Sequence, residues 1–160
     1  MIYLDFTLKS LNKINYLDQV LSECQRLCPI FMFNVPEFAS QSMTVGGVNI
    51  PKNTMVMLDV VSLNHSQTSW GNDALSFRPE RFAPPVSPAT LKAYHGFGNG
   101  HLRRCLGQYL VKNLHKLFLA RLLSQKQIQL TVNHENVNSI RRCRLPFIYV
   151  PDESVKLVQL

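Results

Sequence analysis

The chain has 160 residues, a length that suits a single domain with a sizeable core. Hydrophobic residues make up 46% and charged residues 17%, which is typical of a globular protein and excludes a disordered one. The net charge of +7 would fit an acidic partner, but basic residues never exceed two in a row and no nucleic-acid-binding motif is present. We therefore expect no nucleic-acid partner.

Residues 13–28 predict a helix that ends before Pro29. Its apolar side chains repeat at helical spacing and form one stripe, which we expect to pack: Ile14, Leu17, Leu21, Cys24 and Cys28. Glu23 and Arg26 project from roughly the opposite face. By spacing alone they predict an exposed ion pair, worth a few tenths of a kcal/mol.

The next segment predicts short strands. Met43–Val45 and Val48–Ile50 flank Gly46-Gly47, the pattern of a hairpin with a two-residue turn. Residues 54–58 form a second apolar run and predict another strand. Residues 62–96 contain four prolines and little periodicity, so we expect a long irregular stretch there.

The last third predicts a long helix from Leu106 to about Ser124. Its expected core stripe consists of Leu106, Leu110, Leu114 and Leu117. Three strands are expected beyond it, over residues 128–132, 145–150 and 155–160.

Cys105 follows a glycine-rich turn and two arginines, and it stands at the start of the apolar helix. Positive surroundings and a helix N-terminus both stabilise a thiolate, which can act as a nucleophile or as a soft metal ligand. A cysteine that merely packs is an equally good interpretation of the spacing. The residues alone leave both alternatives open.

A resemblance to a known family separates these alternatives. Residues 97–107 resemble the haem-binding loop of cytochrome P-450 monooxygenases, in which Phe, Gly, Arg, Cys and Gly recur in this order. The resemblance makes Cys105 the axial ligand of the haem iron and Arg103 the partner of a haem propionate. It also implies that Phe97 packs beside the cysteine, Gly100 forms the turn and Gly107 lets the helix approach the haem. Two residues, instead of the usual one, separate Gly100 from Arg103.

Three further motifs follow the family's order. Glu23 to Arg26 resembles the Glu-x-x-Arg of the K helix, and residues 77–82 resemble the Phe-x-Pro-Glu-Arg-Phe segment. The resemblance implies a structural triad of Glu23, Arg26 and Arg81. Residues 50–54 resemble the family's strand entry, with Asn53 where glycine is common; asparagine tolerates the left-handed backbone conformation well.

The resemblance therefore implies a mainly α fold with small β-sheets (α+β), limited to the C-terminal portion of a cytochrome P-450 domain: K helix, meander, haem-thiolate loop and L helix. Residues 1–160 would form a single incomplete domain, the C-terminal third of the catalytic domain. The implied cofactor is haem b, iron protoporphyrin IX. The implied reaction inserts one oxygen atom from O2 into a small organic substrate, with electrons reaching the haem indirectly from NAD(P)H through a redox partner, a reductase or ferredoxin.

The oxygen-activating helix of the family should precede Glu23, and only 22 residues do. We therefore expect no catalytic residue in this chain, no hydroxylation by the chain alone, and exposed apolar patches that favour aggregation or a partner chain. Two alternatives are a non-catalytic haem-binding or protein-interaction remnant of the family, and a basic domain unrelated to haem.

Four basic residues could dock an acidic redox partner, although solvated helix charges would explain the lysines equally well: Lys92, Arg104, Lys112 and Lys116. No signal peptide or membrane-spanning segment is visible, and a cytosol-facing location is expected. The cysteines at 24, 28, 105 and 143 lack zinc or disulfide spacing, so reduced thiols are expected. The sequence predicts neither the substrate nor the membrane attachment.

Overall fold

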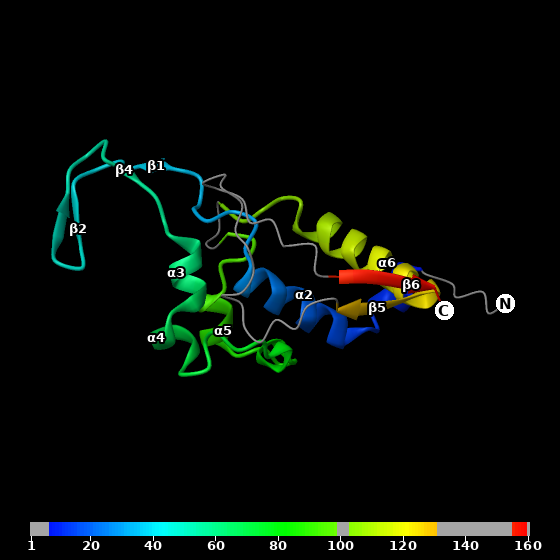
Figure 1. Ribbon diagram of the computed structural model, residues 1–160. Helices are drawn as coiled ribbons and strands as arrows, with labels where there is room; N and C mark the ends of the chain where they lie inside the picture. Colours follow the sequence, from blue (N-terminus) through cyan, green and yellow to red (C-terminus); the bar gives the residue numbers. More distant parts are fainter. Residues whose placement is uncertain (1–6, 99–102, 131–154, 160) are drawn as a thin grey trace.

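The computed structural model describes residues 7–98, 103–130 and 155–159. Two helices, α2 (Asn15–Leu27) and α6 (Gln108–Gln125), pack against each other and run along the molecule (Figure 1). A short helix, α1 (Leu8–Leu11), packs on α6, and the N-cap hydroxyl of Thr7 accepts a hydrogen bond from the backbone of Ser10. The two long helices match the predicted ones to within two residues at each end.

Three small antiparallel sheets accompany the helices. Strands β1 (Glu37–Phe38) and β4 (Met55–Val56) form one pair, and β5 (Lys126–Leu130) pairs with β6 (Val155–Gln159). The predicted hairpin of β2 (Met43–Val45) and β3 (Val48–Ile50) is confirmed and projects at one end of the molecule (Figure 1). The two-residue turn requires positive φ at both positions, and Gly46 and Gly47 adopt φ of 57° and 81°.

The other predicted strands can be compared with the strands of the structure. The strand expected over residues 54–58 is present but shorter, as β4, and the strand expected at 155–160 is confirmed as β6. The strand expected at 145–150 lies outside the described residues. Asn53 has φ of +67°, which confirms that this position requires a left-handed conformation.

The stretch 62–96 is not irregular throughout, which corrects the sequence-based expectation. It contains α3 (Val60–His65), α4 (Gln67–Trp70), the 3-10 helix η1 (Pro79–Phe82) and α5 (Pro88–Ala93). These helices have four to six residues each, too few to show a periodic apolar pattern. Side-chain caps start two of them: Asp59 accepts from Ser62 N–H at 2.9 Å, and Ser87 accepts from Thr90 N–H at 3.1 Å.

The hydrophobic core lies where these short helices meet α2. Trp70, Ala74 and Phe82 are buried, and Ala93 and Tyr94 pack against them. The rings of Trp70 and Phe82 have centroids 6.1 Å apart, and Phe82 meets Tyr94 edge-on at 5.1 Å. This cluster fixes the segment that leads into the Cys105 loop.

The two long helices bury faces other than those predicted. On α2 the buried residues are Ser22, Glu23, Arg26 and Leu27. The expected apolar stripe of α2 is not buried: Ile14 and Cys24 are exposed and the remaining three residues are only partly buried. The polar face of α2 therefore points to the core, because its charges are satisfied there by one another and by backbone groups.

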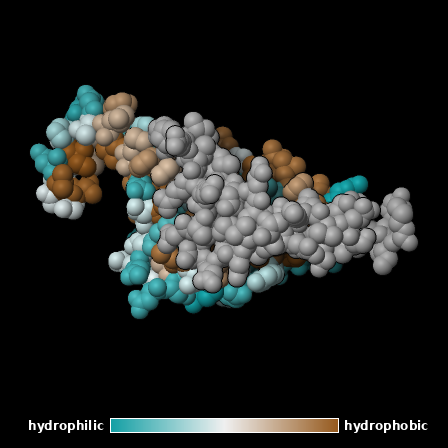
Figure 2. Space-filling model, in the orientation of Figure 1, coloured by the Kyte–Doolittle hydropathy of each residue, from teal (hydrophilic) through white to brown (hydrophobic). Residues whose placement is uncertain are grey.

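The core stripe expected on the second long helix is not buried, which corrects the prediction. Leu106, in the turn before α6, and Leu110, Leu114 and Leu117 on α6 are all exposed. Within the described residues no element covers them, whereas Lys116 on the same helix is buried. Figure 2 shows further hydrophobic side chains at the hairpin end of the molecule, where Val45 and Val48 are exposed. Exposed apolar patches of this kind were expected.

Among the described residues, no helix is both long and apolar enough to cross a membrane. The mixture of helices and small antiparallel sheets confirms the predicted α+β class.

Candidate functional site

Cys105 lies in the turn that enters α6, and its side chain is exposed. Its backbone N–H donates to the carbonyl of Phe97 at 2.9 Å, and its own carbonyl accepts from Gln108 N–H at 3.3 Å. The main chain on both sides of the cysteine is thus fixed, while the sulfur remains accessible. These are the two properties that a protein ligand to a bound metal needs.

Glycines shape the surroundings of the sulfur. Gly98 has φ of +75°, and a Cβ built there would lie 2.6 Å from the carbonyl oxygen of Arg103. No side chain fits at that position without displacing the backbone that leads into Cys105. A Cβ on Gly107 would lie 3.8 Å from the sulfur of Cys105, so glycine there leaves the space beside the sulfur open. Gly100, the expected turn glycine, lies outside the described residues.

The two arginines before Cys105 are both exposed. The Nε of Arg103 lies 3.1 Å from a carboxylate oxygen of Glu37, at the start of β1. Since the side chains of Arg103 and Glu37 are 64% and 43% exposed, this ion pair contributes little to stability and can open readily. Arg103 is therefore free to move its guanidinium to another anion at low cost.

Helix α2 holds the Cys105 loop through a residue that the sequence analysis did not identify. The side-chain Nε2 of Gln25 donates to the carbonyl of Gly96 at 2.6 Å, and the hydroxyl of Tyr94 donates to Oε1 of Gln25 at 3.5 Å. Gln25 and Gly96 are 71 residues apart, so only the fold brings them together. Burial raises the pKa of Tyr94, which keeps its hydroxyl neutral and able to donate.

A buried charge cluster joins α2 to η1. Arg26 donates from Nε and Nη2 to the two carboxylate oxygens of Glu23, at 2.7 and 2.8 Å. Nε of Arg81 lies 3.4 Å from the same carboxylate, an ion-pair contact without hydrogen-bond geometry. The structure thus brings together the three residues that the resemblance grouped as a triad, and Glu23 and Arg26 are both 0% exposed.

Backbone groups supply most of the further hydrogen bonds of this cluster. Nη1 of Arg26 donates to the carbonyls of Asn64 and Ala74, both at 2.7 Å, and Arg78 N–H donates to Glu23 at 2.9 Å. Arg81 donates to the carbonyl of Trp70 at 3.1 Å. The cluster therefore connects α2, α3 and the segment from Trp70 to Arg81, and it supports the scaffold without reaching Cys105.

Lys116 does not lie on the surface predicted to dock a redox partner, which corrects that expectation. This lysine is buried, and its Nζ lies 2.6 Å from a carboxylate oxygen of Asp18 and 3.5 Å from Oδ1 of Asn12. Lys112, one turn earlier on α6, is half-buried, and its ammonium lies 5.5 Å from the ring centroid of Phe97. Burial lowers the pKa of Lys112. The lysines of α6 therefore face the protein, while Arg104 is exposed.

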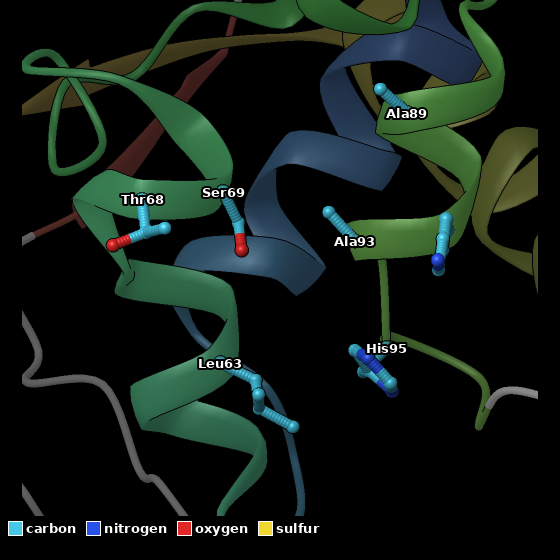
Figure 3. Close-up of a pocket in the computed structure, with 7 residues that line it drawn as sticks. Leu63, Thr68, Ser69, Ala89, Ala93 and His95 are labelled. Atoms are coloured by element: carbon cyan, nitrogen blue, oxygen red, sulfur yellow. The ribbon is translucent and has the colours of Figure 1, made fainter. Parts of the chain in front are cut away.

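An open cavity of about 330 Å³ lies between α3, α4 and α5 (Figure 3). The labelled hydroxyl-bearing side chains Thr68 and Ser69 lie on one side of it and His95 on the other. Lys92, one of the expected docking residues, also lines this cavity, whereas none of the expected haem-site or triad residues does. Burial alone lowers the pKa of His95, so its imidazole is neutral at pH 7.

Comparison with known proteins identifies the family to which the chain is similar. A model of the family described as Cytochrome P450 (cytochrome P-450) matches residues 4–143. Cytochrome P-450 monooxygenase aclC of Aspergillus oryzae is 31% identical over 140 residues, which are 87% of this chain and 29% of that protein. Isoflavone 3'-hydroxylase of Medicago truncatula is 39% identical over 104 residues, 65% of this chain and 20% of that protein.

A solved structure, that of retinoic acid-bound cyanobacterial CYP120A1, superimposes with a TM-score of 0.83 at 29% identity. The similarity covers 100% of this chain and 36% of that one. The chain thus spans less than a third of the length of these two curated relatives. Since the family model matches most of its residues, the chain belongs to the cytochrome P-450 family.

Proposed function

We propose that this chain is the haem-thiolate portion of a cytochrome P-450-type monooxygenase. The observation that carries the proposal is the geometry of Cys105: an exposed sulfur on a main chain fixed by hydrogen bonds to Phe97 and Gln108. A cysteine that merely packs would be buried, as free cysteines usually are.

The residues around Cys105 fit haem. The thiolate is a soft donor suited to iron, and Gly107 leaves space beside it. Leu106 and Leu110, which follow Cys105 in the chain, expose apolar side chains that can pack against a large apolar ring. Arg103 supplies a cation whose present partner, Glu37, holds it weakly, so a propionate can replace that carboxylate.

Each residue has a proposed task. Cys105 would hold the haem iron through its thiolate, Arg103 would bind a propionate, and Phe97 would pack beside the sulfur. Gly100 and Gly107 would let the chain approach the ring. Glu23, Arg26 and Arg81 hold the scaffold that presents the loop. Thiolate-ligated haem supplies the chemistry that cleaves dioxygen, so that one oxygen atom enters a small organic substrate and the other leaves as water.

Electrons would come indirectly from NAD(P)H through a reductase or ferredoxin. Arg104, exposed directly beside Cys105, is the residue that we propose as a contact for such an acidic partner. Within residues 1–160, which we propose to be one incomplete domain, we assign no catalytic residue.

A second candidate function is a non-catalytic haem-binding or protein-interaction remnant. The observation that favours it is the row of exposed leucines on α6, since a solvent-exposed apolar face marks an interaction surface. Turnover measurements on the chain separate this candidate from the enzyme.

Haem titration tests the proposed site. The purified chain should take up one equivalent of haem, and Arg103→Ala should weaken the affinity by about tenfold, because it removes one charge-assisted contact. Arg104→Ala is the matched control: it removes an adjacent exposed charge and should leave haem affinity unchanged. Equal effects of the two substitutions, or no saturable uptake by the unaltered chain, would contradict the assignment.

A further inference from the structure

We propose that Asp18, on α2, is a positioning residue for Cys105: it acts through Lys116 and Lys112 of α6 and through the ring of Phe97. The inference rests on the proposed function in one respect, the role of Cys105 as the haem ligand. The contacts themselves are independent of haem.

The first contact joins the two long helices. Nζ of Lys116 lies 2.6 Å from Oδ2 of Asp18, and the Lys116 side chain is only 6% exposed. Asn12 accepts a weaker hydrogen bond from the same ammonium at 3.5 Å. Because a buried ammonium needs a charged partner, Asp18 determines where α6 can sit on α2.

The second contact reaches the cysteine loop. Lys112 stands one turn before Lys116, so the two ammonium groups repel each other along α6. Asp18 opposes this repulsion, since its charge favours the protonated form of Lys112. The ammonium of Lys112 lies 5.5 Å from the centroid of the Phe97 ring, within the range of a cation–π interaction.

The last step is the hydrogen bond from Cys105 N–H to the carbonyl of Phe97 at 2.9 Å. A displacement of the Phe97 ring changes the main chain that accepts this bond, and so the direction of the sulfur. The path from Asp18 to Cys105 therefore runs through three contacts given by named atoms: Asp18 with Lys116, Lys112 with Phe97, and Phe97 with Cys105. Lys112 joins this path through helix α6, which it shares with Lys116, and through the charge of Asp18.

The direct test measures the exposure of Cys105 in the chain without haem. Iodoacetamide labelling followed by mass spectrometry of the Cys105 peptide distinguishes this thiol from the others. Asp18→Asn should change the labelling rate of Cys105 by about threefold to tenfold, a typical size for coupling carried through packed contacts. Asp18→Glu, which restores the charge, should return the rate to that of the unaltered chain. A changed rate in Asp18→Glu equal to that in Asp18→Asn would overturn the proposal.

A second variant keeps the test decisive if Asp18→Asn fails to fold. Lys112→Met leaves the Asp18–Lys116 ion pair in place and removes only the cation facing Phe97, so it should also alter the labelling rate. Lys52→Met, which removes an exposed lysine in the turn before β4, is the matched control and should have no effect. Unchanged Cys105 labelling in Lys112→Met would contradict the proposed path.

The haem-loaded chain supplies an independent readout. In Asp18→Asn the fraction of the ferrous carbon-monoxide complex that carries thiolate ligation should fall, and Asp18→Glu should restore it. If Cys105→Ser leaves that complex unchanged, the proposed ligand fails while the labelling result still stands. If Cys105→Ser abolishes thiolate ligation but Asp18→Asn changes neither readout, the ligand stands and the positioning role fails.

Discussion

Glu23 and Arg26 form a bidentate ion pair that is entirely inaccessible to solvent, one turn apart on the face of α2 that meets the core. The planar guanidinium matches both carboxylate oxygens and still reaches two backbone carbonyls, so neither charge is left without a partner. The guanidinium carbon also lies 4.8 Å from the ring centroid of Trp70. This pair links the polar and aromatic parts of the core.

Arg26→Ala should lower the free energy of unfolding by about 3–5 kcal/mol, because the carboxylate of Glu23 would remain buried without its main partner. That loss is a large share of the total stability of a typical domain, so much of the variant should be unfolded at room temperature. Urea denaturation followed by circular dichroism measures the change.

Arg78→Ala is the matched control. Its side chain pairs with Asp73 at 2.7 Å, but both side chains are well exposed, so the substitution should cost less than about 1 kcal/mol. A loss of several kcal/mol in Arg78→Ala, or a negligible loss in Arg26→Ala, would contradict the structural role of the buried pair.

Gly98→Ala should disrupt the Cys105 loop. The substitution meets two obstacles, a positive φ of 75° and a Cβ position 2.6 Å from the Arg103 carbonyl oxygen. We expect a loss of haem affinity of tenfold or more, about 1.4 kcal/mol in free energy, measured by haem titration. Gly46→Ala shares the positive φ but has open space around its Cβ, and it lies in the distant hairpin. It should therefore cost some stability and leave haem affinity intact.

Stability should decrease as the pH falls through the range in which His95 titrates. Burial lowers the pKa of His95 below its ordinary value of about 6.5, so the folded chain disfavours the protonated ring. The contribution of the neutral His95 ring to the free energy of unfolding is fully present above pH 6.5. It is lost as the pH falls toward the lowered pKa that His95 has in the folded chain.

Urea midpoints measured between pH 8 and pH 5 test this relation. The decline over that interval should be smaller in His95→Gln, which removes the titrating ring. An identical pH dependence in His95→Gln and in the unaltered chain would show that other groups cause the decline.

The chain alone should not hydroxylate substrates. The face of α6 beside Cys105 is exposed, so water can reach a reactive centre held there and quench its intermediates. Purified chain with haem, a reductant and a panel of small organic substrates should yield no more product than free haem. Turnover clearly above free haem would contradict this expectation.

Much of the local structure can be predicted from the sequence, because it depends on neighbouring residues. The Gly46-Gly47 hairpin and the left-handed Asn53 follow from backbone preferences, and the two long helices follow from apolar periodicity. The short helices between residues 60 and 93 escape prediction, because four to six residues give no periodic signal.

The buried faces of the helices could not be predicted from periodicity. An apolar stripe predicts a core contact only when another element covers it, and the leucines of α6 have no cover among the described residues. Lys116 is buried because a carboxylate from another helix meets it, and a contact between residues 18 and 116 has no local signature. The Gln25–Gly96 contact cannot be predicted from the sequence for the same reason.

The candidate site likewise has a part that the sequence predicts and a part that it does not. The motif around Cys105 suggests a thiolate ligand, and the resemblance to the family assigns Arg103 and the Glu23–Arg26–Arg81 group. The sequence does not predict the contacts that link α2 to the Cys105 loop. These are the hydrogen bond from Gln25 of α2 and the contacts of the α6 lysines with Asp18 and Phe97. Those contacts depend on the packing of segments far apart in the chain.

The absorption spectrum of the ferrous carbon-monoxide complex is the most direct test of the haem-thiolate assignment. Thiolate ligation should shift the main haem band to long wavelength in the unaltered chain and in Cys24→Ser, which changes another exposed thiol. Cys105→Ser should abolish that band. A long-wavelength band that survives in Cys105→Ser, or that disappears equally in Cys24→Ser, would contradict the assignment of Cys105 as the iron ligand.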